Sequence, residues 1–189
     1  MPDGIQFNNS DQRFGLISIT LHWTDALLMI GLIILGYYMT ELTYLHPNYT
    51  ISYTIHKSIG ILVFELAWVQ LLWTLVSYRP GPLPTHKPWQ RMAAHIVHYS
   101  LLILMPLIAF SGFAISSAEG QAVGFFDWYA IPAFLPHRAG LADTAGEIHY
   151  YLAYGTTALI ALHILAACKH QLIDKDGTIS RMLGRRIVS

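Results

Sequence analysis

Residues 148–168 read IHYYLAYGTTALIALHILAAC, an apolar run with one histidine near each end. A run of this length and composition predicts a helix that crosses a membrane. His149 and His163 are fourteen residues apart, and at about 100° per residue this spacing falls roughly 40° short of four full turns. Both rings therefore point to one face of the helix, at levels about 21 Å apart along its axis. One histidine is expected toward each side of the membrane.

The composition of the whole chain is typical of a membrane protein. Of its 189 residues, 54% are hydrophobic and 12% are charged, and the charged fraction is about half that of a soluble domain. Long apolar runs, each sufficient to span a bilayer, cover residues 16–39, 55–76, 95–116 and 148–168. We therefore predict an all-α fold, a single domain over residues 1–189 that forms an antiparallel four-helix transmembrane bundle. No separate soluble domain and no nucleic-acid partner are expected.

Basic residues are distributed unevenly between the two sides of this bundle. With four spans, both termini and the second loop share one side, and nine of the eleven lysines and arginines lie there. They are Arg13, Arg79, Lys87, Arg91, Lys169, Lys175, Arg181, Arg185 and Arg186. Because cytoplasmic loops are enriched in Lys and Arg, both termini are predicted to be cytoplasmic. Residues 1–14 are polar and do not resemble a cleavable signal peptide, so the first helix is expected to be retained.

Depth along the helices pairs four of the ten histidines. The first helix is predicted to leave the cytoplasm and the fourth to return to it, so His22 and His163 lie at one depth near the cytoplasmic side. The second helix enters from outside, which brings His56 level with His149. Neutral imidazole is a common axial ligand of haem iron, and an unpaired imidazole is costly in hydrocarbon. A single such histidine would be read as a core residue bonded to a neighbour, but four at two matched depths favour two bis-histidine haem sites.

Further histidines lie in the helices near the cytoplasmic side. His95 and His98 begin the third helix, where either could replace His22 or His163, and a contact with a haem propionate or a quinone is their favoured role. His170 follows His163 by seven residues and lies on nearly the same stripe of the fourth helix. It is predicted either to hydrogen-bond a propionate or a quinone carbonyl, or to be a plain interfacial histidine.

Loop histidines, intramembrane acids and the third loop receive separate predictions. Ordinary surface residues are expected at His46, His86 and His137. Asp25 follows His22 by three residues, so it could bond a ligand ring or relay protons. Glu65 is predicted to face away from the site of His56. The aromatic third loop either lies in the membrane interface or packs over the helix ends.

Several short motifs together resemble the bacterial cytochrome b561 family of four-helix membrane proteins. They are His-Trp at 22–23, His-Lys-Ser-Ile-Gly at 56–60, Ala-His-x-x-His at 94–98 and Arg-Met-Leu-Gly-Arg-Arg at 181–186. The resemblance covers almost the whole chain and implies a bacterial inner-membrane protein with two b-type haems. The iron ligands that it implies are His22, His56, His149 and His163, the same four that depth selects.

The same resemblance implies a reaction. Members of the family exchange electrons with ubiquinone near the cytoplasmic face, and one is a superoxide oxidase that passes electrons from superoxide to ubiquinone. Lys87 and His170 match positions near the quinone in that member, so both are expected to bond a quinone carbonyl, with His98 as a further cofactor contact. The predicted outer side has a net charge of about −3, which would repel an anion such as superoxide. Its charged residues are Lys57, Arg138, Glu41, Glu119, Asp127, Asp143 and Glu147.

The expected function is therefore electron transfer across the membrane between a periplasmic donor, with superoxide among the candidates, and the ubiquinone pool. Two b-type haems and bound ubiquinone are the expected cofactors, and lipid and a periplasmic donor protein are the expected partners. A haem-bearing membrane anchor for a periplasmic dehydrogenase is the alternative. A haem-free transporter or structural membrane protein, with its histidines bonded in the core, is the other alternative.

Overall fold

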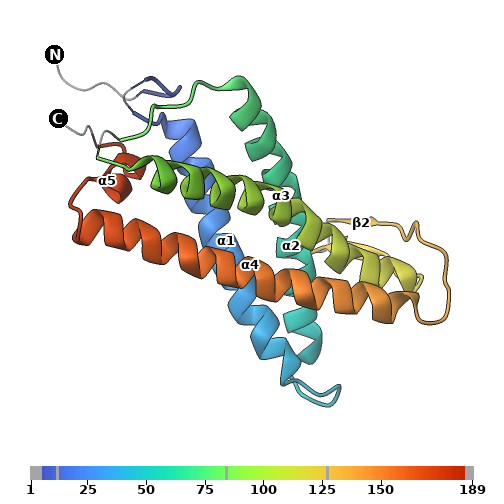
Figure 1. Cartoon of the computed structure of the whole chain (residues 1–189). Helices are drawn as coiled ribbons and strands as arrows, with labels where there is room; N and C mark the ends of the chain where they lie inside the picture. Colours follow the sequence, from blue (N-terminus) through green and yellow to red (C-terminus); the bar gives the residue numbers. More distant parts are fainter. Residues whose placement is uncertain (1–5, 12, 84, 127, 186–189) are drawn as a thin grey trace.

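The computed structural model of the chain describes residues 6–11, 13–83, 85–126 and 128–185. Within these ranges, long helices and one short hairpin follow each other along the chain (Figure 1). Their bounds are α1 Leu16–Thr40, α2 Tyr49–Val76, α3 Pro88–Ala118, β1 Val123–Phe125, β2 Tyr129–Ile131, α4 Leu141–Leu172 and α5 Thr178–Met182. Helices α1 to α4 are long and apolar enough to cross a membrane, which confirms the mostly helical, four-span prediction. Large apolar side chains exposed along them are available to lipid.

Three of the long helices begin earlier than the sequence predicts. Helices α2, α3 and α4 start at Tyr49, Pro88 and Leu141, ahead of the predicted starts at 55, 95 and 148. The apolar pattern marks only the part of a helix that lipid surrounds, whereas a polar first turn can continue the same helix into water. At α3, proline stands at the first helical position, where its missing N–H costs nothing. The loops are correspondingly shorter than predicted.

The long helices pack as two hairpins. Helix α1 packs against α2, α2 against α3, and α3 against α4, and Figure 1 shows the α3–α4 hairpin crossing the other. Short helix α5 lies beside the start of α1, where the indole N–H of Trp23 donates to the Met182 carbonyl at 2.8 Å. The guanidinium of Arg181 lies 5.4 Å from the ring centre of Phe14. We call this the α5 end of the bundle, and the opposite one the hairpin end.

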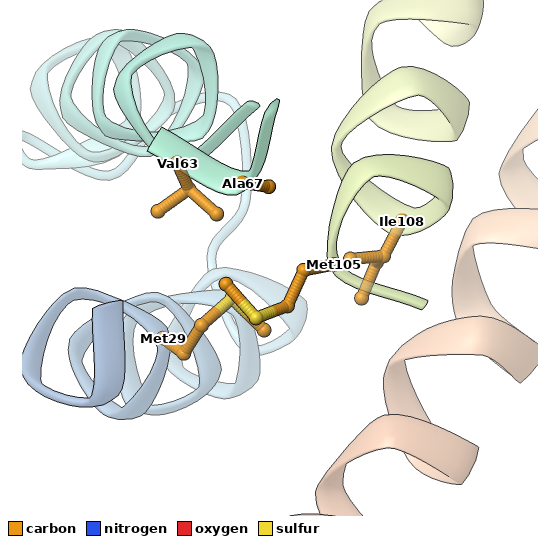
Figure 2. Close-up of a cluster of buried hydrophobic side chains, with 5 residues drawn as sticks. All are labelled: Met29, Val63, Ala67, Met105 and Ile108. Carbon is orange, nitrogen blue, oxygen red and sulfur yellow. The ribbon is translucent and has the colours of Figure 1, made fainter. Parts of the chain in front are cut away.

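The hydrophobic core lies where α1, α2 and α3 meet. It consists of Met29, Val63, Ala67, Met105 and Ile108, which are all buried, and Figure 2 shows Met105 extending from α3 toward Met29 on α1. Met29 lies seven residues after His22 on α1, which is about 10 Å along the helix axis. The core therefore lies inward of the first helix's histidine.

The hairpin β1–β2 follows α3 and packs against α2, a small departure from the all-helical prediction. The strands are antiparallel, with Phe125 opposite Tyr129. The Ser58 hydroxyl of α2 accepts from the Phe126 N–H at 2.9 Å. The Tyr129 hydroxyl donates to the Glu65 carboxylate at 3.0 Å. The third loop packs along α2, where it supplies Glu65 with its partner. The position of its aromatic side chains in the membrane interface stays a prediction.

Candidate functional site

His56 and His149 face each other at the hairpin end. Their ring centres are 6.3 Å apart and their planes are inclined at 80°. Two axial imidazoles on one metal ion have ring centres about 6 Å apart, since each metal–nitrogen bond is about 2 Å long. We call His56 and His149 the hairpin-end pair. Depth matching predicted this pair, and the structure brings the two rings to a separation that fits one iron between them.

Glycines give each ring of the hairpin-end pair its room. A Cβ added at Gly112 would lie 3.1 Å from Cε1 of His149. A Cβ added at Gly36 would lie 3.3 Å from Cε1 of His56. Both contacts are tighter than ordinary van der Waals distances, so a side chain at either position would push on an imidazole. Sequence analysis selected neither glycine, because their positions opposite the rings depend on how the helices pack.

The imidazole of His149 is oriented by α3. Its Nδ1 lies 3.1 Å from the Ile108 carbonyl oxygen and 3.0 Å from the Ser111 hydroxyl. A carbonyl oxygen only accepts, so Nδ1 carries the proton and donates it, which leaves the lone pair of Nε2 free for a metal. His56 Nδ1 is buried and has no hydrogen-bond partner among the described residues. Such an imidazole is poorly satisfied in the protein alone.

Three histidines meet at the α5 end instead of two. The ring centres of His22 and His163 are 6.2 Å apart, and those of His98 and His163 are 5.1 Å apart. We call these three residues the α5-end cluster. The separation of His22 and His163 matches that of the hairpin-end pair. The separation of His98 and His163 is about 1 Å too short to hold a metal ion between the rings with two metal–nitrogen bonds of about 2 Å. The geometry therefore fits His22 and His163 as ligands, with His98 beside them.

The donor sets at both ends fit haem. Each offers two imidazoles from different helices in an apolar setting, and neutral imidazole is a common axial ligand of haem iron. Helix α4 contributes one histidine to each end, as the fourteen-residue spacing predicts. The two sites are joined by one rigid helix and lie about 21 Å apart along it.

A polar pocket lies beyond the histidine cluster at the α5 end. Its volume is about 250 Å³, and it is lined by Thr85, His86, Lys87, Trp89, Gln90, Lys169, Asp174 and Asp176. Lys87 caps α3 through its backbone N–H, which donates to the Gln90 side chain at 2.7 Å, and its side chain is exposed. His170, the other predicted quinone contact, lies with Nδ1 3.3 Å from Oδ2 of Asp176. The structure thus brings Lys87 and His170 to one region.

His86 is a functional candidate that sequence analysis missed. Its ring centre lies 4.6 Å from that of His170, and its Nε2 lies 2.8 Å from Oδ2 of Asp176. The prediction of an ordinary surface histidine is therefore wrong for His86. The sequence carries one local signal of a polar cluster at this place, the two acids Asp174 and Asp176, which follow His170 by four and six residues. It carries no signal that brings His86 to the same cluster.

The acids of this pocket are held in their charged form. Burial acts to raise the pKa of Asp176, but hydrogen bonds from Thr178 and the contact with His86 outweigh it, so that the pKa lies below its ordinary value. The Lys169 side chain donates to Asp174 at 2.5 Å and lowers the pKa of that carboxyl. Both carboxylates are therefore available as hydrogen-bond acceptors at neutral pH.

Two other predicted positions lie apart from these contacts. His95 is exposed and stacks on Tyr99 one turn later, with ring centres 6.3 Å apart. Asp25 is buried in α1, and neither of its carboxylate oxygens has a hydrogen-bond partner among the described residues. The prediction that Asp25 bonds a ligand ring finds no such contact within these residues. Arg186, one of the basic residues of the predicted cytoplasmic side, and Asp127, one of the acidic residues of the predicted outer side, lie outside the described ranges.

Comparison with known proteins identifies the family of the chain. Residues 13–185 match the family described as prokaryotic cytochrome b561. The chain belongs to this family. It is 39% identical over 181 residues to cytochrome b561 homolog 2 of Escherichia coli (strain K12), with 96% of each chain covered. It is 29% identical over 184 residues to the probable superoxide oxidase CybB of Yersinia pestis, which covers 93% of this chain and 98% of the relative.

A third relative is cytochrome b561 homolog 1 of Escherichia coli (strain K12), 29% identical over 178 residues, with 92% of this chain and 98% of the relative covered. All three relatives match over nearly their full length, so the family likeness extends over the bundle as a whole. Membership of the family implies b-type haem and electron transfer in a bacterial inner membrane. The family resemblance drawn from the short motifs is confirmed.

Proposed function

We propose that this protein carries electrons across the inner membrane between a periplasmic donor and ubiquinone, through two b-type haems. The hairpin-end haem would be held by His56 and His149, and the α5-end haem by His22 and His163. The observation that carries the proposal is the pair of matched separations, 6.3 Å and 6.2 Å, between rings at the two ends. Haem iron supplies the one-electron chemistry when it is bound.

The protein's own residues would orient and tune these irons. The Ile108 carbonyl accepts from Nδ1 of His149, which fixes the ring's tautomer and makes its Nε2 a more basic ligand. The apolar core between α1, α2 and α3 keeps water from the space between the two levels. Helix α4 holds one ligand of each site at a fixed spacing, so that the two irons cannot drift apart.

Ubiquinone would bind at the polar pocket of the α5 end. The Lys87 ammonium donates hydrogen bonds and carries a positive charge, which favours a quinone carbonyl as its electron density rises. His170 can donate from its ring, and Oδ2 of Asp176 lies 3.3 Å from Nδ1 of the same ring. Proton delivery to the reduced quinone would come from this side, which the distribution of Lys and Arg predicts to be cytoplasmic.

The donor is proposed to be neutral or cationic. The name of the Yersinia pestis relative, probable superoxide oxidase, makes superoxide a candidate, but the acidic balance of the predicted outer side would slow capture of an anion. Reduction of the purified protein by enzymatically generated superoxide should therefore be slow and should accelerate with ionic strength. If superoxide reduced the protein rapidly and added salt slowed this reaction, the proposal of a neutral or cationic donor would be overturned.

The first test is a reduced-minus-oxidised spectrum with haem quantification, for the parent and for His149→Ala and His163→Ala. The parent should contain two b-type haems per chain, and each variant should lose one of them. His46→Ala is the matched control, because His46 is an exposed loop histidine. One haem in the parent, or two haems in either variant, would end the proposal.

The quinone assignment has its own test. Lys87→Met should lower the rate of ubiquinone reduction at least about tenfold, which corresponds to about 1.4 kcal/mol, while both haems are retained. Lys175→Met is the control, because Lys175 is an exposed lysine at the same end of the bundle. Equal rates in the parent and in Lys87→Met would remove Lys87 from the quinone site without touching the haem assignment.

A further inference from the structure

Three side chains from separate parts of the chain converge at the α5 end. His86 comes from the loop before α3, His170 from the last turn of α4, and Asp176 from the loop before α5. One nitrogen or oxygen atom from each can be chosen so that all lie within 4.8 Å of one another. Two imidazoles and a carboxylate are the donors that zinc and related ions prefer.

The spacing of these atoms is close to that around a bound ion. Ligand atoms about 2.0 Å from a tetrahedral ion lie about 3.3 Å apart. Oδ2 of Asp176 lies 3.3 Å from Nδ1 of His170 and 2.8 Å from Nε2 of His86. Opening the second distance by about half an ångström would bring it to the same value. The ligand atoms of His86 and His170 lie within 4.8 Å of each other, so seating an ion also requires these two rings to turn toward each other.

The carboxylate of Asp176 is already oriented for this task. Its Oδ1 accepts from the backbone N–H of Thr178 at 2.9 Å and from the Thr178 hydroxyl at 2.7 Å. These two bonds hold Oδ1 away from the imidazoles and leave Oδ2 facing both. Metal-binding carboxylates are characteristically fixed by hydrogen bonds of this kind.

Burial and charge also favour a cation. The side chain of Asp176 is 1% exposed, and those of His86 and His170 are each 15% exposed. Asp174, with its Oδ2 2.7 Å from Nδ1 of His170, adds a second carboxylate, and Lys169 balances only one of the two. Lys87, in the lining of the same pocket, offsets the other carboxylate when the imidazoles are neutral. The attraction for a divalent ion therefore comes from the buried carboxylate of Asp176 itself, which lies between the two imidazoles.

We propose that His86, His170 and Asp176 bind one divalent transition-metal ion, with Zn²⁺ the best fit to two imidazoles and a carboxylate. This ion would be separate from haem iron. It would tie the loop before α3 to the loop before α5 across the end of α4. Without a metal, the same residues would form only a hydrogen-bonded cluster of histidines and carboxylates, and the experiment separates the two cases.

The test is equilibrium dialysis against buffered micromolar Zn²⁺, with zinc and iron measured by mass spectrometry. The haem-loaded protein is purified through a tag that contains no histidine and is first stripped with a chelator. One zinc per chain is expected in the parent. His86→Gln and Asp176→Asn should each weaken zinc binding at least about tenfold, with iron unchanged.

Matched variants keep the test decisive. His46→Gln removes an exposed histidine from the opposite side of the bundle and should bind zinc as the parent does. Asp176→Asn could disturb the loop that Thr178 closes, so His86→Gln, whose side chain is not part of that loop, carries the result. Zinc binding that is absent from the parent, or equal in the parent and in His86→Gln, would overturn the proposal.

The zinc site and the quinone site share His170 but can fail separately. Lys87 is not among the three metal ligands, so Lys87→Met should bind zinc normally even where it no longer reduces ubiquinone. Loss of zinc binding in Lys87→Met together with retention in His86→Gln would contradict the assignment of ligands. A normal quinone reaction in Lys87→Met would count against the quinone proposal alone.

Discussion

The two ends of the bundle hold histidines in different ways. At the hairpin end, His56 and His149 stand alone as a pair, each with a glycine against its ring, and α3 fixes the tautomer of His149. At the α5 end, His163 has two histidine neighbours, and a polar pocket with charged side chains follows directly. The hairpin end is thus built around one fixed geometry, whereas the α5 end combines the same geometry with groups that can exchange protons or bind ions.

The largest expected effect tests which histidines of the α5-end cluster bind iron. His22→Ala should lose one of the two proposed haems, because it removes the partner at 6.2 Å from His163. His98→Ala should keep both haems, because the 5.1 Å between His98 and His163 is too short for a shared iron. Haem quantification of the two purified variants measures this.

The reverse outcome would change the comparison. Loss of one haem in His98→Ala, with two retained in His22→Ala, would make His98 the ligand and would leave His22 as its neighbour. The two ends would then differ in which helices hold the iron, since His98 belongs to α3 and His22 to α1.

The next effect tests the close fit of the hairpin-end pair. Gly112→Ala should gain up to about 1 kcal/mol of helix propensity and lose about 1–3 kcal/mol through crowding of His149. The expected result is partial loss of haem from the hairpin end on mild heating. The Soret absorbance measures this loss. Gly155→Ala is the control, because a Cβ there would meet nothing within 4 Å. Equal haem retention in the two variants would show that the glycine is not needed for the ring's position.

A smaller effect is expected from the acid of the polar pocket. In metal-free buffer at neutral pH, Asp176→Asn should lower the free energy of unfolding by about 1–3 kcal/mol, because a charged hydrogen-bond acceptor for His86 and Thr178 is lost. The folded state depresses the pKa of Asp176, so its contribution is present above the unfolded pKa of about 3.8 and is lost as pH falls through the lower folded pKa. Thermal unfolding in detergent at several pH values measures this.

The pH dependence of the stability difference and a variant of a neighbouring acid both check the role of Asp176. The difference in stability should be constant from neutral pH down to about pH 5 and should shrink only below the ordinary carboxyl pKa. Asp174→Asn, at an exposed position on the same loop, should have a smaller effect. A difference that persists unchanged well below the ordinary carboxyl pKa would show that the charge of the Asp176 carboxylate is not its source.

The separate ends of the bundle also show what a sequence can and cannot predict. Periodicity along a helix is regular, so the depths of His22, His56, His149 and His163 followed from counting residues, and the structure brings these rings together as predicted. The early helix starts were missed because hydrophobicity reports lipid contact and not hydrogen bonding. The hairpin was missed because three-residue strands carry almost no periodic signal.

The polar pocket was the hardest part to predict. His86 and Asp176 are ninety residues apart in the chain and lie in different loops, and no periodic pattern relates loop residues to each other. The same is true of Gly112, whose importance depends on the position of a ring on another helix. Helix geometry predicted the residues that face each other along helices, and packing determined the rest.

The smallest effect concerns the hydrogen bonding of His149, a feature that the described contacts show only at the hairpin end. The Ser111 hydroxyl lies 3.0 Å from Nδ1 of His149 and donates to the Ile108 carbonyl at 2.7 Å. Ser111→Ala removes one acceptor for Nδ1, makes the imidazole a less basic ligand and so favours reduced iron. The midpoint potential of the hairpin-end haem should rise by roughly 20–60 mV, which corresponds to a hydrogen bond of about 0.5–1.5 kcal/mol in a one-electron couple. A spectroscopic redox titration measures the shift, and Ser116→Ala, another buried serine of α3, should leave both potentials unchanged. A shift confined to the α5-end haem would contradict the pairing of His149 with the hairpin end, because Ser111 contacts no histidine of the α5-end cluster among the described hydrogen bonds.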